Sequence, residues 1–196
     1  MAQVSPSFGL ALTDMDADGF TDVFLAQNFS QPQIETGPMN PGYSALLRGT
    51  GDQDRPFEVM PVLESGILIP EDARSVVVCD VNQDARPDLF VGINSGNPSL
   101  FVNRSKTGKP ISIRLKGAKG NPTAIGARVT FNAPDISVQS AEIYGGSGYL
   151  SQSEPVLHFA APEVGNSARI TIRWPDGLKE QREIDLAITS VEIEKK

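Results

Sequence analysis

The chain has 196 residues, of which 39% are hydrophobic and 21% charged, a composition typical of a globular protein of one large or two small domains. Its net charge is −7, and an acidic chain without a basic stripe is a poor nucleic-acid binder. A membrane span is not expected, because no apolar run reaches 18 residues, and Cys79 is the only cysteine, so no intramolecular disulfide can form.

The charge divides unevenly along the chain. Residues 1–105 contain 14 Asp and Glu against 5 Lys and Arg, a net charge of −9, whereas residues 106–196 contain 10 and 12, a net charge of +2. We therefore expect two units, 1–105 and 106–196. The 18 Gly and 15 Pro favour many turns and short strands, so both units are expected to be all-β.

The first acidic segment, residues 14–22, has the spacing of a calcium loop. Four carboxylates occupy positions 1, 3, 5 and 9, namely Asp14, Asp16, Asp18 and Asp22. Like charges converging this closely repel one another unless a cation lies between them, and oxygen ligands in this number suit Ca²⁺. Gly19 at position 6 permits a sharp turn, after which the carbonyl of Phe20 can supply a further oxygen.

The loop departs from an EF-hand at its end, where Leu25 replaces the bidentate glutamate of position 12. Its flanks, residues 8–13 and 23–26, are short, apolar and compatible with β-strands. We therefore predict a calcium loop that joins two strands, with Asp22 in the closing role. The alternative is an acidic surface turn, since Asp and Gly are common turn residues.

A second copy lies 66 residues further along. Its residues at positions 1, 3, 5 and 9 are Asp80, Asn82, Asp84 and Asp88. Asn82 removes one charge, and Ala85 replaces the glycine, where a left-handed backbone costs roughly 1 kcal/mol or more. We expect weaker metal binding here, and a structural turn that has lost its metal is the alternative.

On these residues, the D-x-D-x-D-G-x-x-D run at 14–22 and its partner at 80–88, the first half resembles the FG-GAP/VCBS repeat family of integrin-type β-propellers. The resemblance implies strand-joining Ca²⁺ loops, and it implies two ligand sets. These are Asp14, Asp16, Asp18, Asp22 and the Phe20 carbonyl, then Asp80, Asn82, Asp84, Asp88 and the Arg86 carbonyl.

Further first-half strands are predicted at residues 45–48, 57–60, 75–79, 88–94 and 99–102. Residues 29–44 are a Pro- and Gly-rich loop insertion relative to the short link at 95–98. Each copy then supplies about four strands, or one propeller blade. Two blades cannot close a ring of four to eight, so the sheet edges are open and favour pairing with another chain.

The second half alternates apolar and polar residues over short runs. Six strands are predicted, at 109–116, 126–131, 140–144, 156–159, 168–174 and 190–193, with a Pro-Asp-Gly turn after Trp174. Six or seven such strands indicate a small β-sandwich or barrel. The stretches 125–129, 146–152, 157–159 and 172–177 resemble the ASPIC/UnbV domain of the cartilage acidic protein family, although residues 160–162 lack that family's usual glycine-containing turn.

No catalytic constellation stands out. His158, the only histidine, is expected to point away from its neighbours Leu157 and Phe159 and to border a core. We therefore expect a non-catalytic, calcium-binding interaction module for a protein or glycan. The alternatives are an enzyme or accessory factor in secondary metabolism, or a structural fragment of a larger propeller that self-associates.

Calcium sites of modest affinity indicate a secreted or extracytoplasmic location. The first six residues do not form a signal peptide, so the leader would be absent from this chain.

Overall fold

The computed structural model describes residues 5–30, 32–36 and 42–196. Residues 1–4, 31 and 37–41, which hold the start of the chain and the middle of the predicted insertion at 29–44, lie outside the described residues. The described chain is nearly all β, as predicted, and none of its helices is long and apolar enough to cross a membrane. The first half contains β1 (Ser7–Thr13), β2 (Asp22–Gln27), η1 (Ile34–Thr36), β3 (Ala45–Gly49), β4 (Phe57–Val59), α1 (Val62–Ser65), β5 (Ala73–Cys79), β6 (Asp88–Ile93) and β7 (Ser99–Phe101). The second half contains β8 (Lys109–Lys116), β9 (Arg128–Asn132), β10 (Gln139–Glu142), β11 (Val156–Ala161), β12 (Ser167–Arg173), β13 (Lys179–Asp185) and β14 (Ser190–Glu194).

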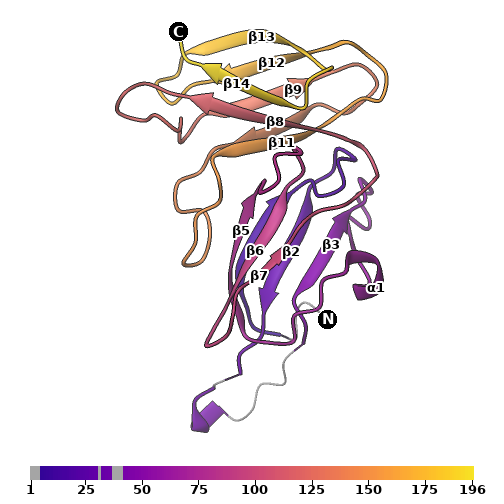
Figure 1. Cartoon of the computed structure of the whole chain (residues 1–196), viewed down its shortest axis with the longest axis vertical. Helices are drawn as coiled ribbons and strands as arrows, with labels where there is room; N and C mark the ends of the chain where they lie inside the picture. Colours follow the sequence, from indigo (N-terminus) through magenta and orange to yellow (C-terminus); the bar gives the residue numbers. More distant parts are fainter. Residues whose placement is uncertain (1–4, 31, 37–41) are drawn as a thin grey trace.

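The two sequence copies form two meander sheets, which we call blade 1 and blade 2. Blade 1 has the strand order β1-β2-β3-β4 and blade 2 the order β5-β6-β7. Blade 2 therefore has three strands where about four were expected, because the chain continues from β7 into the second half. The two sheets pack face to face around one hydrophobic cluster, and Figure 1 shows their strands running steeply in the lower part of the molecule.

The strand register of blade 1 recurs in blade 2 at the same offset as the sequence repeat. Thr13 pairs with Asp22 in blade 1, and Cys79 pairs with Asp88 in blade 2, at the same 66-residue offset. A register shift between Ser7 and Gly9 in β1 recurs between Ala73 and Ser75 in β5. One repeat unit therefore determines the geometry of both sheets.

The offset changes only after the second strand. Val23 pairs with Leu47 in blade 1 and Leu89 pairs with Phe101 in blade 2. The offset is therefore 66 for Val23 and Leu89 but 54 for Leu47 and Phe101. Blade 1 thus holds 12 extra residues between its second and third strands, which is the predicted insertion.

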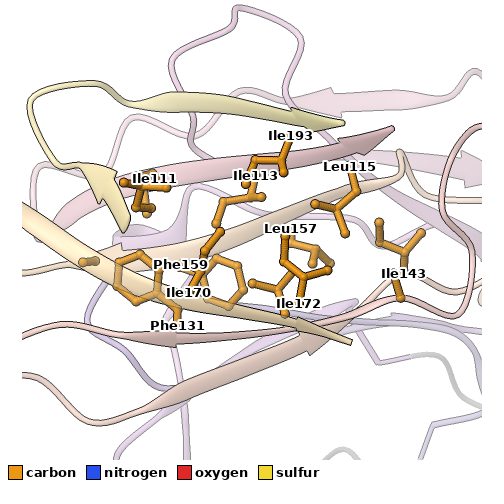
Figure 2. Packing of buried hydrophobic residues seen from close by; sticks show 14 of the residues in the cluster. Ile111, Ile113, Leu115, Phe131, Ile143, Leu157, Phe159, Ile170, Ile172 and Ile193 are labelled. Carbon is orange, nitrogen blue, oxygen red and sulfur yellow. The ribbon is translucent and has the colours of Figure 1, made fainter. Parts of the chain in front are cut away.

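The second half is a β-sandwich with no closed barrel. A four-stranded sheet, β10-β9-β12-β13, faces a three-stranded sheet, β11-β8-β14. Alternate residues of each strand point inward, because successive side chains of a strand lie on opposite faces. Figure 2 shows the resulting core, in which the Phe131 and Phe159 rings stack with centroids 5.3 Å apart and are surrounded by branched aliphatic side chains.

One strand of this sandwich was missed by the sequence reasoning. Strand β13 (Lys179–Asp185) pairs along its whole length with β12, yet it buries only Ile184 fully. A charged edge strand lacks the strong apolar alternation by which the other strands were predicted. The Pro-Asp-Gly turn that precedes it was predicted correctly: Gly177 has φ +89° and its N–H donates to the Trp174 carbonyl at 2.9 Å.

Candidate metal centre

The first acidic loop, residues 14–22, is built by its own carboxylates. The Asp14 carboxylate accepts hydrogen bonds from the N–H groups of Asp18 (3.2 Å) and Gly19 (2.8 Å). The Asp22 carboxylate accepts one from Met15 (2.7 Å) inside the loop and one from Gly49 (2.8 Å) at the end of β3. Positions 1 and 9 therefore fold the loop and anchor it to the sheet.

The second loop, residues 80–88, repeats this pattern bond for bond. The Asp80 carboxylate accepts from Asp84 (3.1 Å) and Ala85 (2.8 Å), and the Asp88 carboxylate accepts from Val81 (2.9 Å) and Asn103 (2.7 Å). The loops thus share one backbone conformation. The predicted second copy is therefore a structural repeat as well as a sequence repeat.

Both loops also use left-handed backbone at the same two positions. Gly19 has φ +93° and Ala85 has φ +69°, while Ala17 and Gln83, two residues earlier, have φ +57° and +60°. Ala85 therefore adopts the strained conformation that the sequence predicted for it, at a cost of about 1–2 kcal/mol. The hydrogen bonds to Asp80 and the burial of Ala85, which is 1% exposed, hold it there.

Three carboxylates of the first loop gather at one point. One oxygen from each of Asp14, Asp16 and Asp18 lies within 4.8 Å of the other two. The Oδ1 atom of Asp16 is buried and has no hydrogen-bond partner, and its Oδ2 atom lies 3.4 Å from Arg48 Nε. A buried carboxylate oxygen without a donor is costly, so this donor set suits a cation.

The other two predicted ligands of the first loop are placed differently. Asp22 lies outside this triplet and its two oxygens each accept one backbone hydrogen bond, which still leaves each oxygen a free lone pair. Phe20 contributes its N–H, which donates to Asp18 Oδ1 at 2.8 Å. Its carbonyl remains a predicted ligand.

Burial raises the pKa values of three carboxyl groups in the first loop. It raises the pKa of Asp14 from 3.8 to about 7 and that of Asp22 to about 6, and in both the nearby loop carboxylates add to the effect. The pKa of Asp18 is also raised, chiefly by burial. A metal-free loop therefore holds protons near neutrality, and a bound cation would favour the ionised carboxylates.

The second loop offers a weaker donor set. Asn82 donates its side-chain N–H to Asp84 Oδ2 at 2.9 Å, and both side chains are exposed. Arg86, at the position matching Phe20, donates from its own backbone N–H to Asp84 Oδ1, and its guanidinium binds the carbonyls of Thr107 (3.2 Å) and Gly108 (3.1 Å). These features agree with the weaker site expected here. Its predicted ligands remain Asp80, Asn82, Asp84, Asp88 and the Arg86 carbonyl.

Both loops lie against strand β11 of the sandwich. His158 Nδ1 lies 3.0 Å from the Ala85 carbonyl oxygen, and a methyl group placed on Gly19 would meet the Ala160 side chain at 4.0 Å. Leu157 and Phe159 point to the other side, into the sandwich core, as the alternation predicted. Burial lowers the pKa of His158, which favours the neutral imidazole in this contact.

The linker between the two halves lies between the two acidic loops and contacts both. Asn103 Nδ2 donates to the Met15 carbonyl at 2.6 Å, and Thr107 Oγ1 donates to the Asp16 carbonyl at 3.2 Å. Gly108, with φ +58°, lies so close to Ala17 that a Cβ would come within 1.9 Å of its carbonyl oxygen. Sequence reasoning missed these contacts, because they join residues about 90 positions apart and only the lone glycine signals a close approach.

A cleft of about 930 Å³ opens between blade 1 and the sandwich. Its walls combine apolar and polar side chains, including Leu10, Leu12, Arg128, Glu142, Tyr144 and Gln152. On one side it is bounded by the segment that descends from the sandwich beside β5 in Figure 1. That segment binds the edge of β5: Ser151 Oγ donates to the Val76 carbonyl at 2.9 Å and Glu154 N–H to the Val78 carbonyl at 3.0 Å.

Tyr149 lies in the same descending segment. It is half-exposed, with its ring 5.6 Å from the ring of Phe8. The segment therefore covers part of one sheet edge that the sequence left open.

Comparison with known families agrees with this architecture. Residues 14–91 match the FG-GAP-like repeat family, and residues 117–195 match the ASPIC and UnbV family. No curated protein matches the chain significantly. The first match contains both acidic loops, and the second contains the whole sandwich after β8. The chain therefore combines a first half similar to the FG-GAP-like repeat family with a second half similar to the ASPIC and UnbV family, in the order that the sequence predicted.

Proposed function

We propose that this chain is a calcium-binding, non-catalytic interaction module that works outside the cytosol. The observation that carries the proposal is the carboxylate triplet Asp14, Asp16 and Asp18, which includes a buried oxygen without a hydrogen-bond donor. Calcium would supply that missing partner and neutralise the mutual repulsion of the three charges. FG-GAP repeats are typically extracellular, where calcium is abundant.

The proposed first site comprises Asp14, Asp16, Asp18, Asp22 and the Phe20 carbonyl. The proposed second and weaker site comprises Asp80, Asn82, Asp84, Asp88 and the Arg86 carbonyl. Positions 1 and 9 of each loop already accept backbone hydrogen bonds, so their role would be double: they would fold the loop and contribute a remaining lone pair to the ion.

Calcium at the first site would stiffen the junction between the blades and the sandwich. The first loop touches the linker through Asp16 and Ala17, and it touches β11 through Gly19. Ordering this loop would therefore fix the walls of the cleft, since both Asp14 and Gly19 line it. We propose this cleft as the surface that contacts a protein or a glycan.

The catalytic alternative has less support from the geometry. The cleft contains the sequence's only histidine, but its Nδ1 atom is engaged by the Ala85 carbonyl. Glu154, an acid in the same wall, is paired with Arg114 and accepts a hydrogen bond from the Asp80 N–H at 3.2 Å. These groups are committed to holding the junction, which favours a scaffold over an enzyme.

The test is thermal unfolding of the whole chain in calcium and in chelator. For a site with the 10⁻⁴–10⁻³ M affinity of extracellular modules, about 10 mM calcium adds roughly 1.4–2.7 kcal/mol to the free energy of unfolding. For a chain of this size that corresponds to a rise in Tm of about 3–10 °C. Magnesium at the same concentration controls for ionic strength and is expected to have a smaller effect.

Two matched variants assign the effect to a loop. Asp16→Asn removes the carboxylate at position 3 of the first loop, and Asp84→Asn removes the one at position 5 of the second loop, whose position 3 is already Asn82. We expect Asp16→Asn to lose most of the calcium-dependent shift in Tm and Asp84→Asn to keep most of it. No shift for the unmodified chain would refute the proposal, and equal shifts in both variants and the unmodified chain would place the calcium elsewhere.

A further inference from the structure

One basic side chain lies against the first acidic loop. The Nε atom of Arg48, on β3, lies 3.4 Å from Asp16 Oδ2, and this Nε atom is buried and has no hydrogen-bond partner. The other oxygen of Asp16 is also buried and has no partner. The two charges are therefore close together without the paired hydrogen bonds that would hold an arginine and a carboxylate firmly in place.

The other end of the same guanidinium is held by the short helix α1. Arg48 Nη2 donates to Glu64 Oε1 at 2.6 Å, and Glu64 belongs to α1. The hydrogen bond to Glu64 is the main cause that raises the pKa of Arg48, and the charges of Asp16 and Asp22 add to the rise. A single positive charge is thus shared between the acidic loop and the helix.

The second copy of the repeat has no counterpart of this arrangement. Its position 3 is Asn82 where the first loop has Asp16, and the offset of 54 that applies after the insertion matches Arg48 to Val102. The described residues 102–108, which follow β7, contain no helix that would match α1. The arginine therefore accompanies the loop that has a carboxylate at position 3.

We propose that Arg48 is a built-in counter-ion that competes with calcium for Asp16, and that Glu64 holds Arg48 aside when calcium binds. The inference rests on the proposed calcium site in the first loop. In the metal-free loop, the positive charge of Arg48 reduces the repulsion among the carboxylates, whereas a divalent ion bound to Asp16 repels the guanidinium. Because Glu64 already accepts a hydrogen bond from Arg48, the arginine can move away from Asp16 and keep a partner.

The competing explanation is a surface ion pair that joins β3 to α1 and has no influence on calcium. The side chains of Arg48 and Glu64 are 37% and 51% exposed, and exposed pairs usually contribute little. The two explanations differ when the pair is broken from either side. Loss of a purely structural contact should change calcium affinity in the same direction in both variants, whereas a counter-ion held aside by Glu64 predicts opposite directions.

The experiment is calorimetric titration of the full chain with calcium. Arg48→Gln removes the competing charge and should tighten binding roughly tenfold. Glu64→Gln leaves Arg48 with Asp16 as its remaining partner and should weaken binding about threefold or more. The double variant should bind like Arg48→Gln alone, because Glu64 acts through Arg48.

Two further variants are controls. Arg48→Lys keeps the positive charge and should bind calcium within about threefold of the unmodified chain. Arg55→Gln, at an exposed arginine between β3 and β4, makes the same change in net charge and should leave the affinity unchanged. Circular dichroism of each variant checks that the fold is retained.

Urea unfolding in chelator gives a readout that does not involve calcium. Arg48→Gln should destabilise the metal-free chain, and the loss should be smaller when Asp16→Asn is also present, because the carboxylate that Arg48 balances is then absent. Equal losses in the two backgrounds would show that Arg48 is not a counter-ion of Asp16 and would overturn the proposal.

The titrations separate this proposal from the calcium site itself. If the unmodified chain binds calcium but the folded Arg48→Gln chain binds it no more tightly, or if Glu64→Gln and Arg48→Gln shift the affinity in the same direction, the counter-ion is overturned and the site stands. Calcium binding by Arg48→Gln but not by the unmodified chain would support the counter-ion and overturn the proposed function. Absence of binding by both chains would overturn both.

Discussion

Replacing Gly108 with alanine is expected to loosen the junction between the blades and the sandwich. Gly108 has φ +58°, and a Cβ there would lie 1.9 Å from the Ala17 carbonyl oxygen and 2.8 Å from that of Asp16. The obstacle is backbone of the first acidic loop, which cannot rotate away as a side chain can. Either the linker or the loop must move by more than 1 Å, if ordinary contacts of about 3.4 Å are to be restored.

The expected magnitude has two parts. The left-handed backbone costs an L-residue about 1–2 kcal/mol, and overpacking a closely filled site typically costs a further 1–3 kcal/mol. Gly108→Ala should therefore lower the free energy of unfolding by about 2–5 kcal/mol. Gly66→Ala is the matched control, since Gly66 has φ +69° but open space around its Cβ position, so it should show only the first part, about 1–2 kcal/mol.

Urea unfolding of both variants and the unmodified chain measures the difference. Calcium titration of the folded Gly108→Ala chain should also show a weakened first site, because the displaced backbone belongs to Asp16 and Ala17, while Gly66→Ala leaves it unchanged. Equal losses of stability in the two variants would refute the reasoning, since the steric part would then be zero and the linker would not be held against the loop.

Two further predictions concern the acidic loops. Asp22→Asn should lower the free energy of unfolding by about 1–3 kcal/mol even in chelator, because the N–H group of either Met15 or Gly49 loses its acceptor. Asp16→Asn, by contrast, should not destabilise the metal-free chain. Equal urea midpoints for the two variants would contradict this division of roles. Because the pKa of Asp14 is raised, the metal-free fold binds a proton more tightly than the unfolded chain, so the stability of the fold should decrease as the pH rises from 3.8 to about 7. Calcium binding near pH 6 should release protons. Calorimetry in buffers of different ionisation enthalpy can detect this release.

The sequence was informative wherever the signal was local. The loop at 14–22, its copy at 80–88 and the strands that flank them follow from residue types within a few positions of one another, because turns and alternation are short-range properties. Strand β13 was not predicted, because its pairing with β12 stabilises it and its own sequence has little apolar alternation. A charged edge strand has a weak sequence signature even when its hydrogen bonds are regular.

The junction could not be predicted because its contacts join distant segments. Asn103 reaches the Met15 carbonyl, and His158 reaches the Ala85 carbonyl 73 residues away, through ordinary polar contacts that no spacing rule encodes. The side of β11 on which His158 lies could be predicted from alternation, but the surface that it meets could not. The placement of the acidic loops at the junction is therefore a property of the tertiary structure alone.

The repeated hydrogen bonds also separate the positions that the turn itself needs from those that would distinguish a metal site. Positions 1 and 9 accept backbone hydrogen bonds in both loops, so a turn of this shape needs those two carboxylates with or without an ion. The position-3 side chain of the first loop, Asp16, has one buried oxygen without a hydrogen-bond donor. In the second loop, position 3 is an exposed asparagine. We therefore expect the residue at position 3 to distinguish an acidic turn from a calcium site. A chain that gains a carboxylate there by Asn82→Asp should gain calcium affinity at the second loop, whereas Asp88→Asn should cost stability in chelator and calcium alike.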